Sequence, residues 1–290
     1  MAMTARPRRS VLYMPASRAS ALEKARSLPA DVLIFDLEDA VAPDAKADAR
    51  AAAVAAAGSG SYGPREIVIR ANGLDTPWGR DDLAAAATSG AHAVLLPKIE
   101  SPVELRRADA VLRAAGAPDD LAVWVMIETP LGVLNVREIA GAGGRLDCLV
   151  LGTSDLAKDL TALHTPDRVA FLPALSLALM AARAYGLTAL DGVHLDLADE
   201  DGFAAACAQG RTLGFDGKTL IHPRQVEAAN RAFAPAEEEV AFARRVIEAH
   251  AAAEAEGKGV VLVDGRLIEN LHVEMAHRTI ALAEAIAARG

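Results

Sequence analysis

Short apolar runs alternate with longer helical patterns along most of the chain, and this alternation constrains the fold more than any other feature. There are eight such runs, and each is followed by a helical segment. Most of the runs are continuously apolar, as expected for parallel strands that are covered on both faces. The pattern predicts an α/β fold, a TIM (β/α)₈ barrel with a C-terminal helical extension.

The expected strands cover residues 10–14, 32–36, 67–70, 93–97, 122–127, 146–152, 188–191 and 216–221. The expected helices cover residues 17–26, 44–57, 79–89, 102–115, 131–140, 173–185, 200–213 and 223–233. A doubly wound sheet is the alternative architecture. It lacks support because no G-x-G-x-x-G motif follows the first expected strand.

The chain continues beyond the eighth unit. We assign residues 1–234 to the catalytic barrel and residues 235–290 to a C-terminal extension. The extension is expected to hold a helix over 236–256, a short strand over 260–263 and a last helix over 271–288. A closed barrel does not need these residues for its own core, so we expect the extension to pack on a neighbouring subunit.

Composition excludes several classes of protein. The 290 residues carry a formal net charge of −9, which argues against a general nucleic-acid binder. No apolar run reaches the length of a membrane span, and the run after the basic start is too short for a signal peptide. Cys148 and Cys207 lack metal-ligand spacing and are interpreted as buried thiols. We therefore expect a cytoplasmic protein.

Charged residues gather where the expected strands end. In a TIM barrel these ends meet at one rim, which holds the functional residues. The residues at these ends are Arg18 after the first strand, Glu38 and Asp39 after the second, Arg70 in the third, Lys98 after the fourth, Glu128 after the fifth, Asp155 after the sixth and His222 after the eighth. The first seven are candidate site residues, whereas His222 before a proline is interpreted as structural.

Glu128 and Asp155 follow neighbouring strands. Two carboxylates in one cleft repel each other unless a cation lies between them. Oxygen ligands without His or Cys favour Mg²⁺, with Mn²⁺ as the alternative. The sequence therefore predicts a metal site at Glu128 and Asp155. The competing interpretation is that each carboxylate caps a helix or pairs with Arg70 or Lys98.

Arg70 is placed to bind a substrate carboxylate through two hydrogen bonds, or to form an internal ion pair with Glu38 or Asp39. Glu38 and Asp39 are candidates for holding metal-bound water. Asp36 is interpreted as a loop residue without a site role. Lys98 is expected to form an ion pair, because its acidic neighbours disfavour a Schiff-base role.

Motifs at these strand ends resemble those of the CoA-ester lyase family of the HpcH/HpaI aldolase superfamily, which includes citrate lyase β subunits and malyl-CoA and citramalyl-CoA lyases. The matching stretches are residues 9–15 (RSVLYMP), 31–41 (DVLIFDLEDAV), 69–72 (IRAN), 96–98 (LPK), 127–129 (IET), 151–156 (LGTSDL) and 217–225 (GKTLIHPRQ). They cover nearly the whole expected barrel, in order.

The resemblance implies Mg²⁺ on Glu128 and Asp155 and a substrate carboxylate on Arg70. It also implies that Arg18 and Lys24 meet coenzyme A phosphates, and that the extension covers a neighbour's site, commonly in a trimer. Residues expected along the substrate are Pro97, Lys98, Gly152 and Thr153. The family's catalytic Asp in the extension matches Glu269, one methylene longer. Together with Arg70, Glu38 and Asp39, Glu269 completes the expected catalytic set.

The expected reaction is Mg²⁺-dependent C–C cleavage, or formation, of a small β-hydroxyacyl-CoA such as citryl-, malyl- or citramalyl-CoA. Its partners would be an acyl-CoA and a keto acid. The alternatives are a β-hydroxyacyl-CoA thioesterase, a malate-synthase-like condensing enzyme, or a citrate lyase β subunit that works on an acyl-carrier-protein thioester. A CoA-independent pyruvate aldolase is disfavoured, because Glu38 and Asp39 replace the His such enzymes carry at an early strand end.

Overall fold

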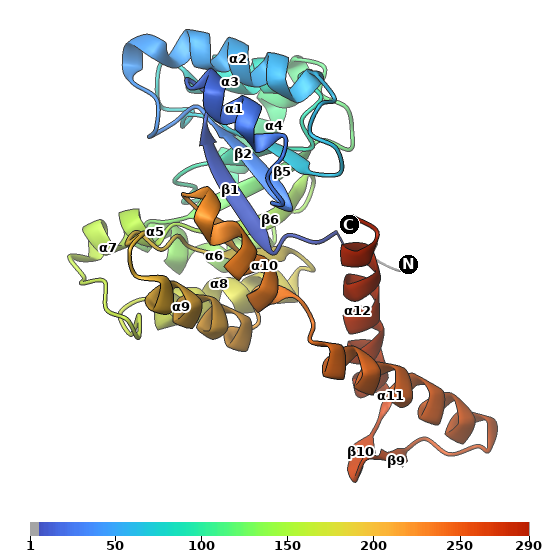
Figure 1. The fold of residues 1–290 in the computed structure, drawn as a ribbon. Helices are drawn as coiled ribbons and strands as arrows, with labels where there is room; N and C mark the ends of the chain where they lie inside the picture. The colour runs from blue at the N-terminus through green and yellow to red at the C-terminus, as the bar shows by residue number, and fades with distance from the viewer. Residues whose placement is uncertain (1–5, 290) are drawn as a thin grey trace. The chain divides into compact units, whose positions relative to one another are not determined.

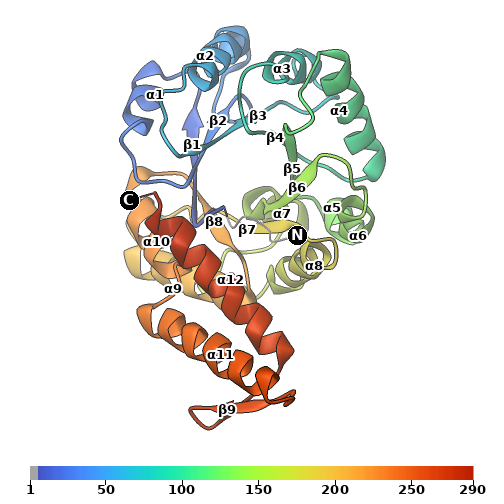
Figure 2. The same ribbon diagram turned by 90° about the vertical axis from the view of Figure 1, so that its right-hand side faces the viewer.

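The computed structural model describes residues 6–289, and within them eight parallel strands form one closed barrel. Strand β1 pairs with β2 on one side and with β8 on the other, which closes the ring. The barrel helices lie outside the strands, as Figures 1 and 2 show. The predicted TIM barrel is confirmed.

The strands of the barrel are β1 (Ser10–Pro15), β2 (Val32–Asp36), β3 (Glu66–Arg70), β4 (Ala93–Leu96), β5 (Ala122–Ile127), β6 (Leu146–Leu151), β7 (Thr188–Asp191) and β8 (Gly217–Leu220). The helices among and after them are α1 (Ala19–Ala25), η1 (Pro43–Ala45), α2 (Lys46–Gly58), α3 (Gly79–Ala86), α4 (Pro102–Ala114), α5 (Pro130–Leu134), α6 (Val136–Ala140), α7 (Thr153–Leu160), α8 (Leu172–Ala184), α9 (Glu200–Leu213), η2 (Pro223–Gln225) and α10 (Val226–Phe233).

Strand positions follow the sequence pattern closely, whereas helix positions do so less well. Strands β2, β5 and β7 have the expected bounds, β8 is shorter by one residue at each end, and the others differ by one residue at one end. The helix expected over residues 131–140 is two helices, α5 and α6, because Asn135 leaves helical geometry between them. Helix α7 was not among the expected helices, although it carries Asp155.

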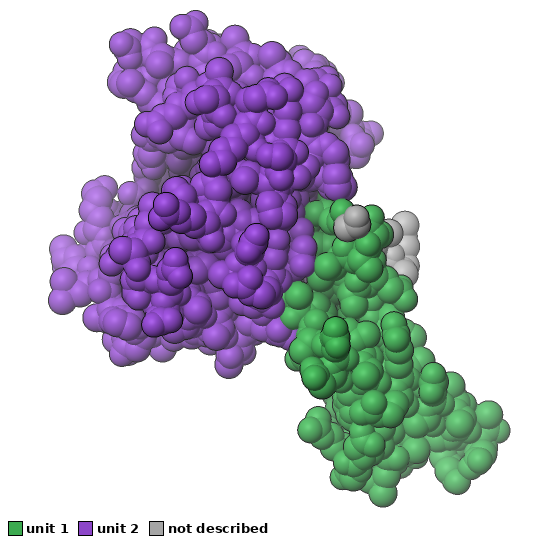
Figure 3. Space-filling view, viewed as in Figure 1, with its two compact units in different colours: residues 1–7, 233–290 green, residues 8–232 purple. Residues whose placement is uncertain are grey.

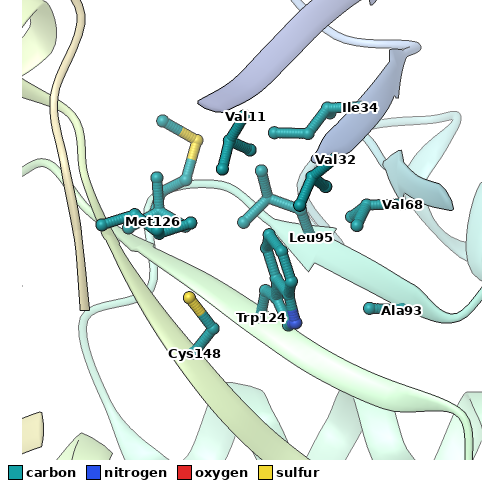
Figure 4. Packing of buried hydrophobic residues seen from close by; sticks show 11 residues of the cluster. Val11, Val32, Ile34, Val68, Ala93, Leu95, Trp124, Met126 and Cys148 are labelled. Carbon is teal, nitrogen blue, oxygen red and sulfur yellow. The ribbon is translucent and has the colours of Figure 1, made fainter. Parts of the chain in front are cut away.

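The barrel interior is an apolar cluster built from alternate residues of the strands (Figure 4). Val32 and Ile34 of β2 and Val68 of β3 belong to it. Since side chains alternate between the two faces of a strand, the next residues on this inner face are Asp36 and Arg70. The same alternation that fills the core thus carries two charged residues to the barrel's C-terminal edge.

The chain divides into two compact units (Figure 3). One is the barrel, Arg8–Ala232. Among the described residues, the other unit contains Arg6, Pro7 and residues 233–289, and its elements are α11 (Glu237–Ala255), β9 (Val261–Val263), β10 (Arg266–Ile268) and α12 (Asn270–Ala287). Helix α11 packs against α12 over a small core formed by Ala243, Val246, Val263, Ile268 and Ala276.

Strands β9 and β10 form an antiparallel hairpin, of which the sequence pattern predicted only the first strand. Asp264 and Gly265 connect them with positive φ angles of 48° and 76°, which suits the tight hairpin turn that Asp-Gly favours. Leu262 and Leu267 face each other across the hairpin and are exposed, at 69% and 52%. The C-terminal unit therefore presents an uncovered apolar face.

Two expectations about the whole chain can be compared with the structure. Cys148 and Cys207 are free and buried, as predicted. Among the described residues, no helix combines the length and the apolar character needed to cross a lipid bilayer.

Candidate active site

All barrel strands run in the same direction, so their C-terminal ends meet at one edge. Asp36 and Arg70 are the last residues of β2 and β3, and Glu128 follows β5 directly. Lys98 follows β4 by two residues, and Asp155 lies in the first turn of α7, just after β6. The structure therefore brings charged residues from consecutive strand ends to one rim of the barrel.

Arg70 is bound by carboxylates of the second strand and its loop. Its Nε and Nη2 atoms donate to the two oxygens of Asp36 at 2.6 and 2.7 Å. Its Nη1 atom lies 2.7 Å from Glu38 Oε2, an ion pair without hydrogen-bond geometry. Asp39 is more distant, at 3.7 Å, and its side chain is 65% exposed. Asp36 has the expected loop role, because its carboxylate accepts the backbone N–H groups of Glu38 and Ala40 at 2.9 and 3.3 Å. The expectation that it has no part in the site is incomplete, because Asp36 also orients Arg70.

Lys98 occupies the middle of the acidic rim. Its Nζ atom lies 3.5 Å from Glu38 and 3.4 Å from Asp155, which agrees with the expected ion pair. Its backbone N–H donates to Glu128 Oε1 at 2.8 Å. Burial opposes its charge, but the carboxylates of Glu38, Asp155 and Glu128 outweigh this effect and raise the Lys98 pKa. A φ of 50° holds its backbone in the left-handed region, a strained conformation typical of functional sites.

Glu128 is an unusual carboxyl group. It is only 3% exposed. Burial, followed by the charge of Glu38, raises its pKa to about 8, although the Lys98 N–H favours the charged form. Burial also raises the pKa of Glu38, an effect that Arg70 opposes. These carboxyls lie close enough to repel each other and are too buried for water to screen them.

The rim fits a divalent cation. Glu128 and Asp155 would hold it, since a cation there would offset the burial, and then the charges of Glu38 and Asp155, that raise the Glu128 pKa. Within residues 6–289, no three His, Cys, Asp or Glu side chains converge as a ready-made metal cage. Mg²⁺ does not require one, because it commonly takes one or two protein carboxylates and completes its shell with water or substrate oxygens.

The residues expected along the substrate lie around these carboxylates. Pro97, Gly152 and Thr153 are buried next to the rim residues in sequence. Gly152 has no room for a side chain, because a Cβ atom there would lie 2.4 Å from Glu128 Oε2. Arg18 and Lys24 are exposed at the two ends of helix α1, which follows β1.

Glu269 lies in the other unit. It is exposed and directly precedes helix α12. Its backbone N–H donates to His272 Nδ1 at 3.0 Å, which fixes the start of the helix. The hairpin and Glu269 are thus ordered within the C-terminal unit.

Tyr13 is a rim residue that the sequence interpretation missed. The Arg70 guanidinium carbon lies 4.8 Å from the centre of its ring, and its hydroxyl donates to Met126 Sδ at 3.7 Å. The signal was available, because Tyr13 follows the core residue Val11 at a spacing of two, as Asp36 follows Ile34. His222 matches its structural interpretation, since its Nδ1 accepts the Arg224 N–H at the start of η2.

Comparison with known proteins gives a consistent result. The chain is 51% identical to the (3S)-malyl-CoA thioesterase of Cereibacter sphaeroides strain ATCC 17025, over 100% of this chain and 99% of the relative. It is 35% identical to the L-malyl-CoA/beta-methylmalyl-CoA lyase of C. sphaeroides strain ATCC 17029, over 98% and 97% of the two chains. Among solved structures, CitE from Mycobacterium tuberculosis in complex with magnesium, acetoacetate and coenzyme A is 31% identical, with a TM-score of 0.77 over 97% of this chain and 100% of that chain.

The family model agrees with these relatives. Residues 9–223, which span most of the barrel and every rim residue described above, match the model of the HpcH/HpaI aldolase/citrate lyase family. On its fold, its motifs and these full-length relatives, the chain belongs to the HpcH/HpaI aldolase/citrate lyase family.

Proposed function

We propose that this protein is a Mg²⁺-dependent enzyme for the coenzyme A thioester of a small hydroxy diacid, with (3S)-malyl-CoA as the first substrate to test. One observation carries the proposal. The buried Glu128, with a pKa raised to about 8, shares the rim with Asp155 and Glu38 and lies close to the fixed guanidinium of Arg70. This set suits a substrate that brings both a carboxylate and metal-binding oxygens.

Each rim residue has a role in binding. Glu128 and Asp155 hold the cation, which polarises the substrate oxygens when bound. Arg70 binds the free carboxylate through Nη1 alone and not through the expected two-bond fork, because Asp36 takes Nε and Nη2. The substrate carboxylate would then share Nη1 with Glu38. Asp36 keeps the guanidinium plane in place. Arg18 and Lys24, exposed on α1, receive the phosphates of coenzyme A by charge attraction.

Thioester hydrolysis is the reaction we favour, because the relative with 51% identity over the full length is named a thioesterase. Water adds to the thioester carbonyl, the C–S bond breaks, and the coenzyme A thiol leaves with a proton. Glu38 is suited to move that proton, because burial raises its pKa towards neutral pH. The products are malate and free coenzyme A.

C–C cleavage is the second candidate, favoured by the full-length lyase relative. A base removes the proton of the hydroxyl group, and the bond between the hydroxyl-bearing carbon and the α carbon breaks. The resulting thioester enolate takes up a proton. From malyl-CoA, the products would be acetyl-CoA and glyoxylate.

Product analysis distinguishes the two reactions. Purified protein with Mg²⁺ and (3S)-malyl-CoA should release malate and a free thiol, both measured by mass spectrometry and thiol titration. If acetyl-CoA and glyoxylate form instead, the reaction is C–C cleavage and not hydrolysis. The proposal fails if neither product pair forms from malyl-, citramalyl- or citryl-CoA, while the fold is intact by circular dichroism.

We further propose that residues 235–290 cover the barrel rim of a neighbouring subunit and supply Glu269 there, in a homo-oligomer such as a trimer. Leu262 and Leu267 are exposed, and both lie in the hairpin that precedes Glu269 in the chain. Their exposure supports this proposal. An apolar hairpin face needs a partner surface, and an oligomer offers one.

A further inference from the structure

A second charged cluster lies beyond the rim residues described above. Asp191, the last residue of β7, and Lys218 of β8 are both fully buried, and their side chains are 2.9 Å apart. Arg168, from the segment between α7 and α8, donates through Nη1 to both oxygens of Asp191 at 2.8 Å. Buried charges of this kind contribute little net stability compared with apolar residues, so their presence calls for another explanation.

This cluster fixes the peptide groups of Gly192. Asp191 Oδ1 accepts the Gly192 N–H at 2.8 Å, and Lys218 Nζ donates to the Gly192 carbonyl. Thr219 Oγ1 donates to the Asp191 carbonyl at 3.0 Å. Both polar groups of Gly192 are therefore held by charged side chains, in a buried setting where such bonds are strong.

Gly192 packs directly against the start of helix α7. A Cβ atom on Gly192 would lie 2.7 Å from Thr153 Oγ1 and 2.9 Å from both Thr153 Cγ2 and the carbonyl oxygen of Leu151. Thr153 is the first residue of α7 and is 3% exposed, so it has no free direction in which to move. Asp155 lies in the same turn of this helix. A shift of Thr153 would therefore move Asp155 with it.

The same junction touches Glu128. Gly152, which caps α7 immediately before Thr153, lies so close to Glu128 that a Cβ atom would be 2.4 Å from its Cβ and its Oε2. The position of the first turn of α7 therefore affects the positions of both carboxylates of the candidate metal site, Asp155 and Glu128.

Arg168 is held in place at a conformational cost. Its φ of 54° is in the left-handed region, which residues other than glycine rarely adopt. Its Nε donates to Gln209 Oε1 at 2.7 Å, which ties it to helix α9. Strain of this kind persists only where the surrounding structure fixes the residue, and it gathers at functional sites.

We propose that Arg168, Asp191 and Lys218 are positioning residues for the metal carboxylates. Their buried network fixes Gly192, and Gly192 fixes the first turn of α7, which sets the places of Asp155 and Glu128. This inference rests on the metal site of the proposed function.

The test measures Mn²⁺ affinity directly, by electron paramagnetic resonance of free Mn²⁺, and requires no turnover. Gly192→Ala should weaken Mn²⁺ binding by about 10- to 100-fold, the usual effect of disturbing groups behind metal ligands. Thr153→Ala removes the two side-chain atoms that the new methyl would strike but leaves the Leu151 carbonyl oxygen, so the double variant should regain only a small part of the lost affinity. Lys218→Met should weaken binding in the same range. The Mn²⁺ affinity of each variant is measured at a temperature well below the midpoint of its own thermal unfolding.

Gly141→Ala is the matched control. Its new methyl would also be crowded, at 3.0 Å from the Tyr185 ring, but it lies at the end of α6. It should keep wild-type Mn²⁺ affinity. If Gly192→Ala and Lys218→Met bind Mn²⁺ as wild type does, the positioning role is wrong. An equal loss in the Gly141→Ala variant would also overturn it. If the wild-type protein binds no Mn²⁺, the metal site of the proposed function is what fails.

Discussion

Arg70 and Asp36 form a two-bond ion pair inside the barrel mouth, with 2.6 and 2.7 Å between the paired nitrogen and oxygen atoms. The two residues end neighbouring strands and face each other in register. Because Asp36 takes Nε and Nη2, the guanidinium plane is fixed and Nη1 points at Glu38. Arg70 is thus oriented before any substrate arrives, which lowers the entropic cost of binding a carboxylate.

Arg70→Lys should therefore be a severe change although the positive charge remains. A lysine cannot bond both oxygens of Asp36 and also present a donor to the substrate. We expect kcat/KM to fall by an amount equivalent to about 2–5 kcal/mol of transition-state stabilisation. Arg65→Lys, just before the start of β3, is the control and should leave the kinetics unchanged. Wild-type kinetics in Arg70→Lys would remove Arg70 from the site.

Glu128→Ala and Asp155→Ala should each strongly reduce Mg²⁺-dependent activity and Mn²⁺ binding, because each removes one of the two carboxylates, and so one ligand and one negative charge, from the ion. Asp159→Ala, an exposed carboxylate on the same helix as Asp155, should change neither. Isothermal titration with Mn²⁺ and assays with Mg²⁺ measure both properties. Full activity in excess EDTA would disprove the metal requirement.

The sequence pattern predicted the barrel because its signal is repeated eight times, once in each unit. The rim residues were predicted for the same reason, since strand ends locate them. The contact of Asp36 with Arg70 was missed because it depends on register. Alternation along β2 places Asp36 on the inner face, but only the alignment of β2 with β3 sets it directly opposite Arg70.

Other features depend on contacts between residues distant in sequence. Asp191 and Lys218 are 27 positions apart, and no local motif shows that they pair in the buried layer. The second hairpin strand was missed because three residues, Arg266–Ile268, carry too little pattern of their own. The Asp264–Gly265 turn before them was the signal that could have revealed it.

Metal affinity should depend on pH, because Glu128 must lose its proton before it can bind a cation. Its pKa of about 8 means that the metal-free carboxyl carries a proton at neutral pH, and this proton must leave before a cation binds. Mn²⁺ affinity should therefore rise up to roughly tenfold per pH unit below about 8 and level off above it. Titrations at pH 6.5, 7.5 and 8.5 test this prediction, which a constant affinity over that range would contradict.

The same shift predicts the stability of the metal-free protein. The pKa of Glu128 in the folded protein lies above its ordinary value of 4.5, so the folded state holds the proton more tightly than the unfolded state does. Proton binding by Glu128 therefore stabilises the fold fully at pH values below about 4.5. This contribution is lost as pH rises from about 4.5 through about 8. Glu128→Gln, which cannot ionise, should show a smaller decline in urea midpoint over this window when EDTA is present.

The opposite edge of the barrel holds a stabilising ion pair. Arg8, which is 9% exposed, donates through Nε and Nη2 to the two oxygens of Glu66 at 2.8 Å and stacks over Trp124. Residues at the N-terminal face of such barrels serve stability. Arg8→Ala should lower the unfolding free energy by about 3–5 kcal/mol, because it removes two charged hydrogen bonds from the buried Glu66 carboxylate.

Urea unfolding measures this loss. The double variant Arg8→Ala/Glu66→Gln should recover part of the lost unfolding free energy, because the buried residue 66 then carries no charge. The activity of the folded fraction should not change in either variant. A drop in kcat at temperatures where Arg8→Ala is fully folded would show that the N-terminal edge influences the rim, contrary to our expectation.

The last prediction concerns the C-terminal extension and Glu269. If the extension of one subunit completes the site of another, Glu269→Gln and Glu128→Ala damage different halves of a shared site. Each variant alone should be inactive. Mixed oligomers made by coexpression should regain activity, because an intact barrel rim from one subunit can meet an intact extension from another. With equal amounts and random assembly, about one quarter of the sites would be complete. If Glu269 instead served its own barrel, every site would keep one defect and mixing would restore nothing. Full activity of Glu269→Gln alone would show that this carboxylate is not needed at all. Mass spectrometry of intact oligomers confirms that subunits have mixed, so that an absence of recovery counts against a shared site and not against the exchange.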